Sequence, residues 1–141
     1  MVVTDADRQA VADLLERFRE AWARLDADAA LACFDPEPGT VVIGTDAGEF
    51  WRSYQDLVEP FQAMTTAFDR ADYAYGDGDP NMEIAGDMAW AAGMLHGAFD
   101  TANGRIELPM RMSAVMRRRP DGSWIVRHAH FSVASAEPVE Y

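Results

Sequence analysis

The fold is decided by residues 88–134, which read MAWAAGMLHGAFDTANGRIELPMRMSAVMRRRPDGSWIVRHAHFSVA. Two clusters of turn-forming residues interrupt this stretch, TANG at 101–104 and PDG at 120–122. Proline, glycine, asparagine and aspartate in such clusters are typical of tight turns between strands. The stretch therefore predicts an antiparallel meander of three long strands, over 88–100, 105–119 and 123–134.

Upstream of this meander, apolar residues recur at helical spacing. Leu14, Phe18 and Trp22 lie on one face of a helix, and Thr4 with Asp7 has the spacing of a capping box. Similar patterns follow the cap-forming residues 26–28 and Ser53, and Pro60 should kink the helix that contains it. The sequence predicts three helices, over 5–25, 29–34 and 53–68.

Shorter strands separate and follow these helices. A β-branched run at 41–43 returns through a turn to 49–51, and a turn at 76–80 is predicted to join two strands, 71–75 and 81–85. Helices therefore precede most of the strands. Such an order is typical of an α+β fold in which helices cover one face of a curved sheet.

Composition limits the possible functions. The chain has 141 residues, which suits a single domain over 1–141, and a net charge of −12, which argues against nucleic acid or an anionic membrane as partner. All twelve cationic residues are arginine, so lysine chemistry is excluded. The single cysteine, Cys33, cannot form an internal disulfide. With no visible signal peptide or membrane span, we expect a cytoplasmic protein.

Candidate acid–base groups cluster on the last strand. Alternate residues of a strand face the same side, which gives two rows: Trp124, Val126, His128, His130 and Ser132, and Ile125, Arg127, Ala129 and Phe131. The residues alone leave open which row lines a cavity, because a bulge would shift the phase. A histidine there is a candidate proton carrier, or else a core residue bonded to a backbone carbonyl.

Other candidate contacts lie on neighbouring segments. Arg111 and Ser113 share a face of the preceding strand, where the arginine could bind a carboxylate or enolate, or pair with Glu107 on the sheet surface. Trp51 is either a pocket wall or a core residue, and Asp46 is either a ligand contact or a turn residue.

Two metal patterns are incomplete. The run from Asp77 lacks the glycine and the glutamate of a calcium loop. His128 and His130 could bind zinc or iron with His96 or an acid as third ligand, but the sequence contains no second ligand motif. We therefore expect no metal and no cofactor.

Taken together, these segments resemble the SnoaL-like branch of the nuclear-transport-factor-like superfamily. The resemblance rests on the short helix ending in Phe34, on 43–51 and on the closing run 124–132, and it covers nearly the whole chain. It implies a cone, in which a strongly bent antiparallel sheet packs on three helices of the N-terminal half and encloses a pocket. It also implies a homodimer formed through the sheet, and it places His130, Ser132 and Arg111 at the pocket.

The superfamily includes ketosteroid isomerase, dehydratases, cyclases and kinase association domains, so the resemblance does not fix a reaction. We expect a protein that binds a small, largely apolar carbonyl compound, and that acts as an isomerase, cyclase or lyase if it is an enzyme. His130 and Arg111 are the predicted catalytic residues. Predicted ligand contacts are Trp51, Ser132, His128, Ser113, Trp124 and Asp46. The alternative is a non-catalytic ligand-binding or dimerisation module.

Overall fold

Each helix begins where the sequence supplies a cap. In the computed structural model, which describes residues 2–141, α1 spans Asp5–Ala23, α2 spans Ala27–Leu31 and α3 spans Tyr54–Thr66. Thr4 forms the predicted capping box with Asp7, and the side chains of Asp26 and Ser53 accept backbone N–H groups of α2 and α3. These caps satisfy donors that a first helical turn leaves free. The three predicted helices are confirmed, although α1 ends at Ala23 instead of residue 25 and α2 spans Ala27–Leu31 instead of 29–34.

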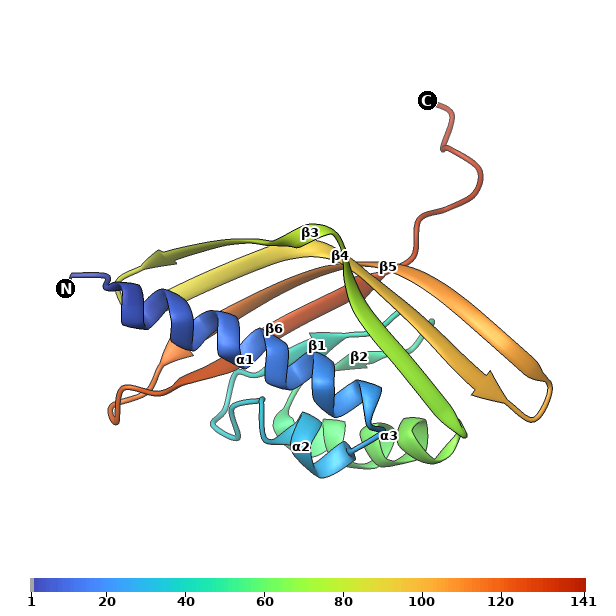
Figure 1. Ribbon diagram of the computed structural model, residues 1–141, viewed down its shortest axis with the longest axis horizontal. Coiled ribbons are helices and arrows are strands. Elements are labelled where there is room, and N and C mark those ends of the chain that lie inside the picture. Colours follow the sequence, from blue (N-terminus) through green and yellow to red (C-terminus); the bar gives the residue numbers. More distant parts are fainter. Residues whose placement is uncertain (1) are drawn as a thin grey trace.

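The strands form one sheet that bends around the helices. They are β1 (Val41–Ile43), β2 (Phe50–Trp51), β3 (Arg70–Ala85), β4 (Met88–Thr101), β5 (Gly104–Arg118) and β6 (Trp124–Ser132), in the spatial order β2-β1-β6-β5-β4-β3. All three helices lie on the same side of the sheet (Figure 1). The predicted α+β fold and the three-strand meander are confirmed.

The sheet is mixed: four of its strand pairs are antiparallel, as the resemblance implies, and one pair is parallel. β1 runs parallel to β6, with Val42 beside Ala129. The pairing begins before β1, where Phe34 forms a parallel bridge with Val126 and the backbone N–H of Asp35 donates to the Val126 carbonyl. The chain that leaves α2 is thereby aligned with β6 before β1 starts.

The turn predicted at 76–80 is wrong, because these residues are a bulge within the continuous strand β3. Gly76 lies opposite Met94, and pairing resumes with Asn81 opposite Ala92. Asp77 and Gly78 adopt φ values of 56° and 92°, in the left-handed region. That conformation lets the extra residues leave the ladder while the strand on either side continues to pair.

The sheet face toward the helices, here called the inner face, carries the core. Met110, Met112 and Met116 are buried at alternate positions of β5. Phe131 of β6 stacks on Phe18 of α1 with ring centroids 5.7 Å apart. Further ring contacts join these two into one connected network of Phe18, Trp22, Phe34, Trp51, Phe61, Phe68, Tyr73, Phe99 and Phe131. The rings occupy the space between helices and sheet in which the resemblance places a pocket.

Candidate functional site

A bulge in β6 decides which predicted residues share a face. Val115 pairs with His128 and Met116 pairs with Val126, so Arg127 is an extra residue that reverses the alternation. Trp124 therefore lies in the core at 2% exposure, while His130 is exposed on the sheet face away from the helices. We call this the outer face. The predicted row that joined Trp124 to His130 is split between the two faces.

Four of the predicted site residues come together on the outer face. The strand register places Ser113 directly opposite His130 and Arg111 directly opposite Ser132. The Nε–H of Arg111 donates to the Ser132 hydroxyl oxygen over 3.1 Å. Facing side chains of paired strands lie about 5 Å apart at Cβ, so the four form one cluster. We call these residues, Arg111, Ser113, His130 and Ser132, the polar patch.

Apolar side chains surround the polar patch. Trp90 of β4 pairs with Val115, and Ile43 of β1 pairs with both His130 and Phe50 along the same face. Trp90 is 49% exposed and Phe50 is 48% exposed. The patch is therefore a polar centre within a largely apolar sheet surface that faces solvent in the single chain.

The other predicted contacts serve the fold. The carbonyl of Val41 accepts a hydrogen bond from Nδ1 of His128 over 2.9 Å, which is the structural alternative weighed for a histidine in this strand. Trp51 packs on Phe61 with ring centroids 6.3 Å apart. Asp46 is an exposed turn residue whose backbone N–H donates to the Glu49 carboxylate over 2.9 Å. These three residues do not join the polar patch.

The sequence interpretation missed a buried ion pair at the loop after α2. Asp35 is 1% exposed, and its carboxylate lies 2.6 Å from Arg117 Nε and 3.4 Å from an Nη of Arg127. Burial alone would raise the pKa of Asp35, but the backbone N–H of Glu37 and the two guanidinium groups outweigh it and lower the pKa. In the sequence Asp35 stands before a proline in a loop, where an aspartate is an ordinary turn residue.

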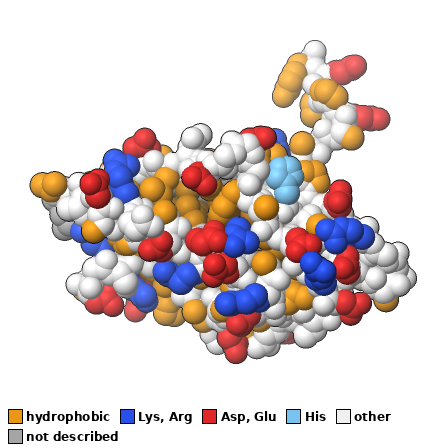
Figure 2. Space-filling model, viewed as in Figure 1, with side chains coloured by type: hydrophobic (Ala, Val, Ile, Leu, Met, Phe, Trp, Pro, Cys, Tyr) orange, Lys and Arg blue, Asp and Glu red, His pale blue; other side chains and the backbone are white. Residues whose placement is uncertain are grey.

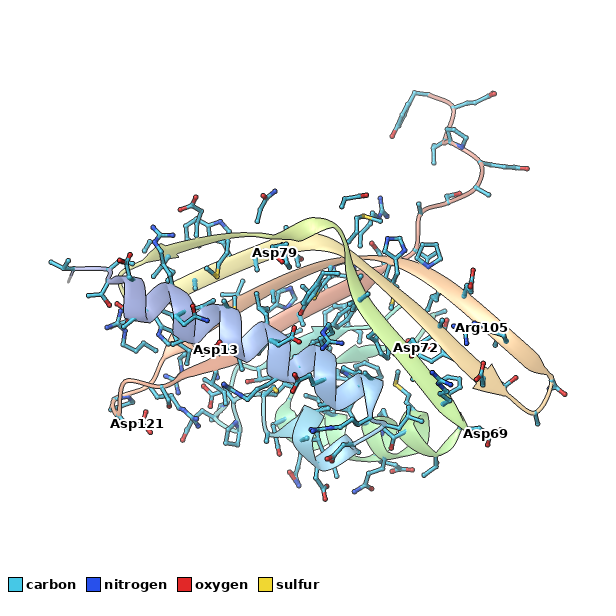
Figure 3. The ribbon with its side chains drawn as sticks, viewed as in Figure 1. Asp13, Asp69, Asp72, Asp79, Arg105 and Asp121 are labelled. Atoms are coloured by element: carbon cyan, nitrogen blue, oxygen red, sulfur yellow. The ribbon has the colours of Figure 1, made fainter. Side chains whose placement is uncertain are left out.

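Arg111 differs from half of the twelve arginines in its lack of a carboxylate partner among the described residues. Six arginines have carboxylate partners in the described residues: Arg19, Arg70, Arg105, Arg117, Arg118 and Arg127. Figure 2 shows acidic and arginine side chains intermixed on the side of the molecule that carries α1. At the end of the β4–β5 hairpin, Arg105 and Asp72 face each other at 3.3 Å (Figure 3). Within residues 2–141, no carboxylate lies within 4.0 Å of Arg111.

Two hollows of the surface lie away from the predicted residues. One of about 540 Å³ lies where α1 meets β3, β4 and β5, and one of about 510 Å³ lies between the α1–α2 turn and α3. None of the eight predicted site residues lines either hollow.

The one thiol of the chain is buried. Burial raises the pKa of the Cys33 thiol to about 11, so the reactive thiolate is scarce at neutral pH. Across residues 2–141 no three His, Cys, Asp or Glu side chains gather as metal ligands. None of the helices there has both the length and the apolar character of a membrane-spanning segment.

Comparison with known proteins identifies a family model that matches most of the chain. Residues 11–136 match the model of the SnoaL-like domain family. No curated protein sequence matches the chain.

Solved structures match the fold over nearly the whole length. A nuclear transport factor 2-like superfamily protein from Salmonella enterica has a TM-score of 0.85 at 19% identity, with 97% of each chain covered. A candidate dehydratase of that family from Streptomyces avermitilis has a TM-score of 0.79 at 18% identity, covering 95% of this chain and 100% of its own. A candidate calcium/calmodulin-dependent protein kinase II association domain from Xanthomonas campestris has a TM-score of 0.77 at 20% identity, covering 96% of this chain and 91% of its own. At these identities the likeness establishes the fold alone.

Proposed function

Because this chain belongs to the SnoaL-like domain family, we propose that it is a small-molecule-binding protein that works as a homodimer, with the outer face of its sheet between the two copies. The observation that carries this proposal is the apolar surface around the polar patch, where Trp90 leaves 49% of its surface in solvent. Large apolar surfaces of this kind mark contact sites in proteins.

Charge supports a second copy as the occupant of this face. The strand segments at the centre of this face contain no aspartate or glutamate, although the chain carries a net charge of −12. These segments are 41–43, 50–51, 90–94, 111–115 and 128–132. Two copies that approached through most other surfaces would bring many carboxylates together, whereas these segments carry one arginine, Arg111, and the nearest acidic strand position is Glu83 opposite Trp90. The structural neighbour described as an association domain is consistent with this use of the fold.

A cytoplasmic location belongs to the same proposal. Its support is the lone Cys33, which is buried and free, as is usual where thiols stay reduced.

Replacing Trp90 by glutamate tests the homodimer. Because the substitution places a charge in the middle of the buried contact, we expect the dissociation constant of the dimer to rise by roughly 30-fold or more, the effect of losing a hot-spot aromatic. Sedimentation velocity over a concentration series measures this constant.

Ile106→Glu is the matched control. Ile106 is also 49% exposed, but it lies near the hairpin end of β5. Because side chains alternate along a strand, Ile106 belongs to the opposite face of β5 from Arg111. We expect this variant to dimerise like the unmodified chain. Equal loss of dimer in both variants, or in neither, would contradict the proposal.

The second candidate function is proton transfer at a carbon next to a carbonyl. What favours it is the register that pairs His130 with Ser113 and places the Arg111–Ser132 pair two residues further along the strands. In this hypothesis the imidazole removes the proton, and the guanidinium stabilises the enolate oxygen that forms.

Hydrogen–deuterium exchange into a panel of enolisable ketones, followed by NMR, tests this second function without a known substrate. We expect His130→Gln to slow a catalysed exchange by roughly 10²–10⁴-fold, the usual contribution of an acid–base group, and His96→Gln to leave it unchanged. An exchange rate that His130→Gln does not alter would exclude the histidine mechanism.

A further inference from the structure

The polar patch presents several hydrogen-bond donors together on the outer face. Arg111 uses its Nε–H on Ser132, and among residues 2–141 its two Nη groups have no hydrogen-bonded partner. Because the Ser132 hydroxyl accepts that bond, its own proton is free to donate. The hydroxyl of Ser113 and the ring of His130 lie beside it and add further donors. A guanidinium with hydroxyl groups around it is the arrangement that recognises a carboxylate.

The absence of acids around Arg111 distinguishes it from the paired arginines. Arg105 contacts three carboxylates at the hairpin end, whereas the segments around Arg111 contain none. Met94 lies opposite Arg111 on β4, and Ile43 lies beside His130 on β1. A ligand that meets these neighbours would combine one anionic group with an apolar body.

Association through the outer face would bring two such patches out of water. Removing a guanidinium from water without a partner charge costs far more than burying a neutral side chain. Two copies of Arg111 in one interface therefore oppose association unless an anion accompanies them. A carboxylate on each patch would supply the missing charge, and each ligand would become part of the contact.

We propose that the polar patch binds the carboxylate of a small apolar acid and that this ligand tightens the homodimer. The inference rests on the proposed dimer and adds to it the ligand class and a form of regulation. Ligand binding and association are then linked, so the ligand strengthens the dimer by the same factor by which the dimer strengthens ligand binding.

The test uses benzoate as the probe and benzamide as its neutral counterpart. Sedimentation velocity on the full chain at constant ionic strength gives the dissociation constant of the dimer with each compound. We expect benzoate to lower it by about 5- to 150-fold, the usual range for coupled sites, and benzamide to leave it unchanged. Arg111→Gln should dimerise at least as tightly as the unmodified chain without ligand and should lose the response to benzoate.

Arg8→Gln is the control for the change in net charge, because Arg8 lies on α1, on the other side of the sheet. This variant should keep the response to benzoate. A dimer that ignores benzoate, or that Arg111→Gln weakens, would overturn the inference while leaving the homodimer intact. The latter result would mean that a carboxylate of the partner copy pairs with Arg111. A chain that stays monomeric with and without benzoate would overturn the proposed function as well.

Discussion

Phe61→Ala is expected to lower the free energy of unfolding by about 3–5 kcal/mol, the usual cost of truncating a buried phenylalanine. Phe61 is 3% exposed, and its ring contacts Trp22, Phe34 and Trp51 at centroid distances of 4.9, 5.5 and 6.3 Å. Alanine would remove contacts with α1, with the loop after α2 and with β2 together. Urea unfolding followed by circular dichroism measures the change.

Ile106→Ala provides the comparison for this measurement, because Ile106 is 49% exposed and has much less burial to lose than Phe61 at 3%. We expect it to lower the free energy of unfolding by less than about 1.5 kcal/mol, well below the cost of truncating Phe61. A loss below about 1 kcal/mol for Phe61→Ala would mean that the interior is not the filled ring network described above, and that space for a ligand exists between helices and sheet.

Asp35→Ala is expected to cost about 2–4 kcal/mol, because it leaves Arg117 and Arg127 without their shared carboxylate. This loss of stability is smaller than the loss expected for a fully buried ion pair, because the two guanidinium groups keep part of their contact with water. Asp46→Ala, which removes an exposed turn carboxylate, should cost less than about 0.5 kcal/mol. Urea unfolding at neutral pH compares the two variants, and equal losses would contradict the role given to Asp35.

The same ion pair predicts a dependence on pH. The folded state lowers the pKa of Asp35, so the unfolded state binds this proton more readily. The stabilisation is therefore complete above the ordinary aspartate pKa of about 3.9, and it is lost as the pH falls through the lower pKa of the folded state. We expect unmodified protein to lose more stability between pH 5 and about pH 3 than Asp35→Asn does. A parallel decline of both would exclude this cause.

Local sequence patterns predict most of the helices and strands, but they do not predict how distant strands pair. The strands of residues 88–134 follow from turn residues and length, and α1 follows from its apolar face and its capping box. The parallel pairing of β1 with β6 joins segments about 87 residues apart, and no local pattern reports such a contact. The bulge at Asp77 was equally hidden, because aspartate and glycine at left-handed φ values also fit a turn.

The residues of the candidate site can be predicted from the sequence, but the face of the sheet on which they lie cannot. The sequence predicts Arg111, Ser113, His130 and Ser132 as site residues, and the register brings these four together. Their face depends on Arg127, the one extra residue in β6, which turns the histidines away from the helices. A shift of one residue exchanges the two faces of a strand, so the sequence alone left this choice open.

The homodimer through the outer face is the central claim, and the molar mass of the unmodified chain tests it most directly. Sedimentation equilibrium at neutral pH, over concentrations from about 1 to 100 μM and with benzoate present, should give a mass that rises toward twice 15.6 kDa. A mass that stays at 15.6 kDa over that whole range would contradict the claim.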